Sequence, residues 1–92
     1  MTVATVISRE ELAAKRLIIS EKLKEMDFVE DEQYLGEFSR DNANGSSETV
    51  VFLDGDDRQF AVYSFYNADE VLSEYKRFNV VTDIQRLFNQ IH

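Results

Sequence analysis

The first third of the chain carries apolar side chains at helical spacing. They follow one another at intervals of seven, four and three residues, which places them on one stripe of a helix. The stripe consists of Leu12, Ile19, Leu23 and Met26. Ser8 and Glu11 precede it at capping-box spacing, in which each side chain satisfies a free backbone N–H at the helix start. The pattern predicts a helix over residues 9–26.

Three stretches rich in aromatic and β-branched residues follow, separated by turn signals. They cover residues 34–39, 49–53 and 59–66. The first connection is long and polar and contains Asn44-Gly45, which accepts positive φ, and the second is the tighter turn at residues 54–57. Links this short exclude parallel crossovers, so the stretches predict an antiparallel β-meander. Both faces of the third strand are apolar or aromatic, which suits the middle of a sheet or a sheet covered by helices.

The last quarter of the chain predicts one or two helices. Asn67 and Glu70 have the spacing of a helix cap. An apolar set follows them and predicts a helix that ends near Asn79: Val71, Leu72, Tyr75 and Phe78. Thr82 and Gln85 resemble a further capping box. The second apolar set is Ile84, Leu87, Phe88 and Ile91. The sequence therefore predicts a single α+β domain over residues 1–92: an N-terminal helix, a three-stranded antiparallel β-meander and one or two C-terminal helices.

The composition excludes several kinds of site. The chain has no Cys, which excludes thiolate nucleophiles and thiolate metal ligands. Its one His, at position 92, is the only histidine that could activate a nucleophilic serine. Its three glycines are isolated, so no phosphate-binding loop is present. The Asp54–Asp57 turn lacks the Gly and Glu positions of a calcium-binding EF-hand loop. We therefore expect no catalytic residues, no metal site and no cofactor.

The sequence also indicates a location. No apolar run reaches the length of about 18 residues that a transmembrane helix needs, and the N-terminus lacks the features of a signal peptide. We expect a cytoplasmic protein without membrane contact.

The charge of the chain is concentrated in its middle. The 92 residues hold 18 Asp and Glu against 10 Lys and Arg, a formal net charge of −8. Residues 27–57 alone carry −9, with Arg40 as their only base, while the rest of the chain sums to +1. A carboxylate excess of this size repels nucleic acid, so direct binding to it is not expected.

Concentrated acidity favours a basic protein as partner. Carboxylates on turns and strand ends can occupy a surface that holds phosphates, and their field steers association. Solubility is the alternative explanation of the same charge. The candidate partner-binding residues are the carboxylates Asp27, Glu30, Asp31, Glu32, Asp41, Glu48, Asp54, Asp56 and Asp57, together with Tyr34. Tyr34 is included because the four tyrosines of the chain cannot all be buried with their hydroxyls hydrogen-bonded. Exposed tyrosines are enriched at protein interfaces.

The whole-chain profile of size, acidity, missing cysteine and small helix-and-sheet organisation resembles phage-encoded anti-CRISPR proteins of the type I-F class. The resemblance includes no diagnostic motif and carries over no site residue. It implies binding to subunits of a CRISPR–Cas effector complex in the host cytoplasm, where the protein blocks target DNA binding or hybridisation. Two other functions fit the same sequence. One is a structural or assembly adaptor, such as a small phage component or a homo-oligomer, and the other is an immunity-like inhibitor of a basic nuclease.

Overall fold

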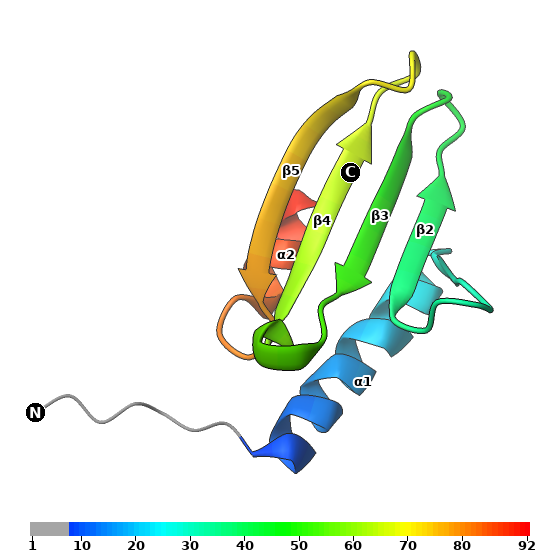
Figure 1. Cartoon of the computed structure of the whole chain (residues 1–92). Helices are drawn as coiled ribbons and strands as arrows, with labels where there is room; N and C mark the ends of the chain where they lie inside the picture. The colour runs from blue at the N-terminus through cyan, green and yellow to red at the C-terminus, as the bar shows by residue number, and fades with distance from the viewer. Residues whose placement is uncertain (1–7) are drawn as a thin grey trace, which may run out of the picture.

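The computed structural model describes residues 8–92 as an α+β fold with one antiparallel sheet (Figure 1). The sheet has five strands in the order β1-β2-β3-β4-β5, each antiparallel to the next. In chain order the elements are α1 (Arg9–Glu25), β1 (Val29–Glu30), β2 (Glu37–Asp41), β3 (Ser47–Phe52), the 3₁₀ turn η1 (Gly55–Asp57), β4 (Phe60–Tyr66), β5 (Leu72–Asn79) and α2 (Ile84–Gln90). No helix among residues 8–92 is long and apolar enough to cross a membrane.

Helix α1 confirms the predicted helix and one of the two predicted capping-box hydrogen bonds. The Ser8 hydroxyl accepts a hydrogen bond from the Glu11 backbone N–H at 3.1 Å, which caps the helix start. Leu12, Ile19 and Leu23 are buried on one stripe and Met26 packs against the core. The helix ends where Asp27 takes a positive φ of 70°.

The core lies on one face of the sheet. Alternate positions of β2, β3 and β4 point into it, and both helices contribute buried residues to the same cluster. Figure 1 shows α2 behind β4 and β5. The core consists of Leu12, Ile19, Leu23, Phe28, Phe38, Val50, Phe52, Ala61, Tyr63, Phe78, Val80, Leu87 and Phe88. The opposite face, which we call the open face, has no helix over it among the described elements.

Three sequence predictions need correction. The sheet has five strands, because β1 forms between the predicted helix and the first predicted strand, and β5 replaces the predicted helix over residues 71–79. Asn67 caps a tight turn instead of a helix, since its side-chain oxygen accepts hydrogen bonds from the N–H groups of Asp69 and Val71. One C-terminal helix is present, and it begins after Asp83 with no side-chain cap, so the Thr82 capping box is wrong.

The turns define two ends of the sheet. The β2–β3 turn and the β4–β5 turn lie together at the end drawn at the top of Figure 1. The β1–β2 loop (residues 31–36) and the β3–β4 loop (residues 53–59) lie at the opposite end, where the Phe52 N–H donates to the Gly36 carbonyl at 2.8 Å. This second end holds most of the predicted partner-binding residues.

Candidate protein-docking surface

Two acid-rich loops meet at one end of the sheet. The β1–β2 loop and its flanks bring four carboxylates, and the β3–β4 loop brings three. We call this set the acidic end: Glu30, Asp31, Glu32, Glu37, Asp54, Asp56 and Asp57. All of its members except the half-buried Glu30 are exposed. The fold therefore brings together carboxylates from two separate stretches of the sequence, residues 30–37 and 54–57.

Hydrogen bonds hold the β1–β2 loop in a defined shape. The Asp31 carboxylate accepts from the backbone N–H groups of Gln33 and Tyr34 at 2.8 and 2.9 Å. The Glu30 carboxylate accepts from the Gly36 N–H at 2.9 Å, and Gly36 adopts a φ of 89°, which glycine reaches without strain. These bonds fix the backbone of the loop, which lowers the conformational entropy that the backbone loses on binding.

Two large side chains stand at the tip of that loop. Tyr34 is 62% exposed and Leu35 is 80% exposed. Aromatic side chains surrounded by a polar rim are typical of residues that contribute most to binding energy. The carboxylates of the acidic end form such a rim.

Three members of the acidic end form ion pairs with basic side chains. Lys24 lies 3.9 Å from Glu30, Arg16 lies 3.9 Å from Asp54, and Arg77 donates to Asp57 at 2.8 Å. These pairs are at least partly solvent-exposed and contribute little stability. Among the described residues, the other four carboxylates have no cation within ion-pair distance: Asp31, Glu32, Glu37 and Asp56. Arg58 lies in the β3–β4 loop beside these carboxylates, so this end keeps an excess of negative charge that bases compensate in part.

An open groove of about 740 Å³ lies between α1 and the acidic end. Its apolar lining includes Leu17, Leu35 and Phe52, and Arg16 lies over the Phe52 ring at 4.8 Å. Its charged lining consists of three bases and two carboxylates: Arg9, Arg16, Arg58, Glu30 and Asp54. The groove can accept an apolar side chain next to Leu35.

The remaining predicted residues lie elsewhere. Asp27 and Asp41 are exposed and line a second, polar hollow towards the opposite half of the sheet, next to His92. The predicted carboxylates therefore do not form one continuous band. Glu48 is completely buried and cannot contact a partner. Its prediction as a partner-binding residue is therefore wrong.

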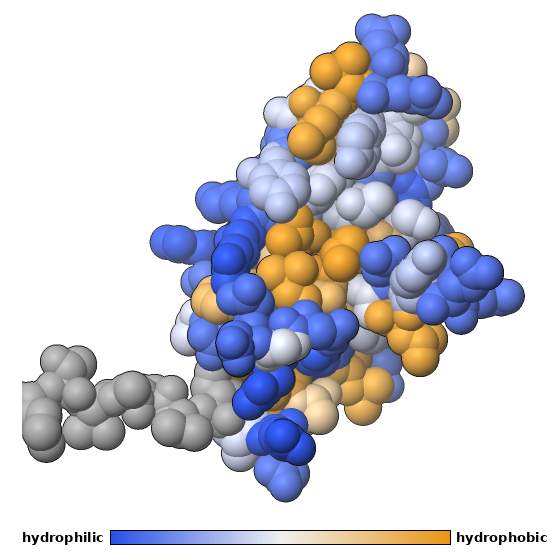
Figure 2. All heavy atoms as spheres, viewed as in Figure 1, coloured by the Kyte–Doolittle hydropathy of each residue, from blue (hydrophilic) through white to orange (hydrophobic). Residues whose placement is uncertain are grey.

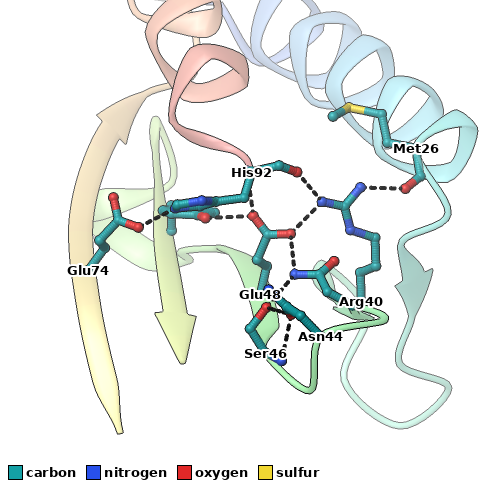
Figure 3. A network of polar contacts seen from close by, with 9 residues as sticks. Met26, Arg40, Asn44, Ser46, Glu48, Glu74 and His92 are labelled. Carbon is teal, nitrogen blue, oxygen red and sulfur yellow. Dashed lines mark hydrogen bonds and ion pairs between the residues drawn. The ribbon is translucent and has the colours of Figure 1, made fainter. Parts of the chain in front are cut away.

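Glu48 instead organises a buried polar network (Figure 3). Its carboxylate accepts from the Tyr63 hydroxyl at 2.6 Å, from the His92 backbone N–H at 2.7 Å and from Asn42 at 3.3 Å. It also pairs with Arg40, which donates to the carbonyl oxygens of Met26 at 2.9 Å and His92 at 2.6 Å. The network therefore ties β2, β3 and β4 to the C-terminal residues and to the end of α1.

The network fixes the protonation states of its members. Burial alone raises the pKa of Glu48, but hydrogen bonds from Tyr63, His92, Arg40 and Asn42 outweigh burial and hold the pKa below its usual value. Burial and the bond to the Glu48 carboxylate raise the pKa of Tyr63 strongly. Glu48 is therefore ionised and Tyr63 neutral near neutral pH, an arrangement that supports structure.

The second half of the network lies at the surface. The His92 ring stacks on Phe65 with centroids 4.1 Å apart and contacts the Glu74 carboxylate, which also accepts from Gln90 at 2.6 Å. Within residues 8–92, no group of three or more His, Cys, Asp or Glu side chains is arranged to hold a metal ion.

Comparison with family models, with curated proteins and with solved structures finds no match to this chain. The candidate docking surface consists of the acidic end together with Tyr34 and Leu35. Two of its residues, Leu35 and Glu37, were missing from the sequence-based set. Both fall within the stretch predicted as a strand over residues 34–39, whereas β2 begins only at Glu37 and leaves Leu35 in the exposed loop.

Proposed function

We propose that this protein is a non-catalytic inhibitor that binds a basic, nucleic-acid-binding surface of another protein through its acidic end. The observation that carries the proposal is the rigid β1–β2 loop, which presents exposed Tyr34 and Leu35 inside a rim of carboxylates. A surface evolved to hold phosphates combines positive charge with groups that pack against bases, and this loop is complementary to both.

The specific target that we propose is a type I-F CRISPR–Cas effector complex, on the strength of the sequence-profile resemblance. Docking there excludes guide or target nucleic acid from the basic groove and blocks target DNA binding. The carboxylates accelerate association, while Tyr34 and Leu35 slow dissociation.

The test is a binding experiment with purified effector complex and labelled target DNA. Wild-type protein should bind the complex and compete with the DNA. The acidic-end variant Glu32→Gln/Asp54→Asn/Asp56→Asn should associate several-fold more slowly and with a flatter salt dependence. The loop variant Tyr34→Ala/Leu35→Ala should dissociate at least about tenfold faster.

A matched control removes the same amount of charge from another face. Glu10, Glu21 and Glu25 lie exposed on α1, and their replacement by Gln leaves the acidic end intact. Equal losses in this control and in the acidic-end variant would show that net charge alone drives binding. If the wild-type protein does not bind the complex at micromolar concentration, the proposal that a Cas effector complex is the target is wrong.

A further inference from the structure

The open face of the sheet carries an apolar cluster beside the polar residues Ser39, Ser47, Thr49 and Ser64. When helices cover one side of an antiparallel sheet, the other side normally carries polar side chains. Here the outward positions of β3 and β4 include Val51, Phe60, Val62 and Tyr66, and β5 adds Tyr75, which is 66% exposed. Figure 2 shows hydrophobic side chains gathered in the middle of this face with hydrophilic ones around them.

One row across this face has a self-complementary pattern. The strand registers align Glu37 on β2 with Val51, Val51 with Val62, and Val62 with Arg77 on β5. Read from one edge of the sheet to the other, the row is acid, valine, valine, base. A copy of this row turned by 180° places Arg77 opposite Glu37 and valine opposite valine.

We infer that a second copy of this chain covers the open face. In this homodimer the two sheets pack face to face around a two-fold axis that runs parallel to the strands, between β3 and β4. The axis places β2 of each copy over β5 of the other, so that Glu37 of each copy faces Arg77 of its partner and the valines of both rows meet in the centre.

The geometry of packed sheets permits these contacts. At a strand spacing of about 4.8 Å, β2 and β5 each lie about 7 Å from the axis. The usual angle of about 30° between aligned sheets displaces facing edge residues by about 4 Å, which Glu and Arg side chains can span. Arg77 is already held at the edge of the face, 4.0 Å above the Phe60 ring and hydrogen-bonded to Asp57.

The charges also select the direction of the axis. A two-fold axis perpendicular to the strands sets β2 over β2, which brings the exposed carboxylates Glu37 and Asp41 against those of the partner. Like charges facing each other across an interface cost binding energy. The parallel axis sets β2 over β5 instead, which separates the β2 carboxylates of the two copies and adds two ion pairs.

The size of the face predicts a weak dimer. The four longer strands span about 20 Å by 20 Å, or about 400 Å² per copy, which is about half the area of a standard interface. We expect a dissociation constant on the order of 10–100 µM. The parallel axis also turns both acidic ends to the same side of the dimer. The inference rests on the sheet alone and does not depend on the proposed function.

The test is a charge exchange followed by light scattering and sedimentation, from about 5 µM to about 500 µM protein. The wild-type protein should shift from monomer to dimer over this range. Glu37→Arg alone and Arg77→Glu alone should each raise the dissociation constant at least about tenfold, because each creates two like-charge contacts. An equimolar mixture of the two variants should restore dimers, since every contact in the heterodimer again joins opposite charges.

The mixing step separates an interface effect from damage to the fold, because a misfolded variant gains nothing from its counterpart. Arg86→Glu, exposed on α2 on the opposite face, is the matched control and should dimerise as the wild type does. A wild-type protein that stays monomeric at about 500 µM overturns the inference. A dimer that both single variants leave unchanged also overturns it, since that result assigns the contact to another surface such as the free edge of β5.

Discussion

At the scale of single residues, Glu48 organises the buried polar network. A carboxylate without solvent exposure is tolerated only when charge and hydrogen bonds compensate its desolvation, and here Arg40, Tyr63, Asn42 and the His92 N–H supply them. Sequence reasoning counted this residue as surface charge, because a glutamate between polar turn residues gives no sign of its burial. Position 48 alternates inward with Val50 and Phe52, which is a strand pattern that the charge obscured.

Glu48→Gln should destabilise the protein by about 2–3 kcal/mol, because it leaves the Arg40 charge half-buried without its partner. For a domain of this size the loss lowers Tm by roughly 10–20 °C. Thermal unfolding followed by circular dichroism measures it. Glu37→Gln, an exposed glutamate on the neighbouring strand, is the control and should change Tm by less than about 3 °C.

The same residue makes stability depend on acid pH. The folded protein holds the pKa of Glu48 below the value that the unfolded chain has, so the unfolded chain takes up this proton first as the pH falls. The contribution is complete above about pH 5 and is lost progressively below it. The difference in unfolding free energy between wild type and Glu48→Gln should therefore narrow between pH 6 and pH 3. Urea titrations at several pH values measure it, and a constant difference would contradict the role of Glu48.

At the scale of elements, β5 is the segment for which the sequence pattern predicted a helix and the structure has a strand. Val71, Leu72, Tyr75 and Phe78 lie at helical intervals, yet Phe78 points into the core while Tyr75 points to the open face, as strand alternation requires. Tyrosine and phenylalanine favour strands, and pairing with β4 outweighed the weak helical signal. The hairpin prediction for β2, β3 and β4 succeeded because turn residues and β-branched runs agreed, although β2 begins three residues later than expected.

The turn before β5 contains a testable strain. Glu70 adopts a φ of 62°, a left-handed conformation that is unfavourable for a side chain with a Cβ atom. Glu70→Gly should stabilise the protein by up to about 1 kcal/mol, because glycine reaches this conformation without strain. Asp69→Gly, one residue earlier and outside the left-handed region, should destabilise by about 0.5–1 kcal/mol. Chemical denaturation of the two variants measures the contrast, and equal effects would show that Glu70 is unstrained.

At the scale of the whole molecule, the fold separates charge from apolar surface. The carboxylates concentrate at the acidic end, whereas the two central strands of the open face carry valine, phenylalanine and tyrosine together with serine and threonine, and its charges lie on the outer strands. The sequence alone gives the total charge and its concentration in residues 27–57. It could not predict which clusters meet, because that depends on the strand order, nor that helices leave one face of the sheet open.

This separation predicts opposite salt responses for the two proposed associations. Binding of a basic partner to the acidic end is driven by attraction, so raising NaCl from about 20 to 200 mM should slow association several-fold, as counterions screen the carboxylates. Two copies of the chain each carry a net charge of −8 and repel one another, so the same increase should leave the homodimer unchanged or tighten it despite the two Glu37–Arg77 pairs. Binding kinetics and sedimentation over one salt series measure both. If added salt weakens the homodimer as steeply as it weakens the partner complex, then charge pairs hold the homodimer together. That result would contradict an interface that is stabilised by the apolar row.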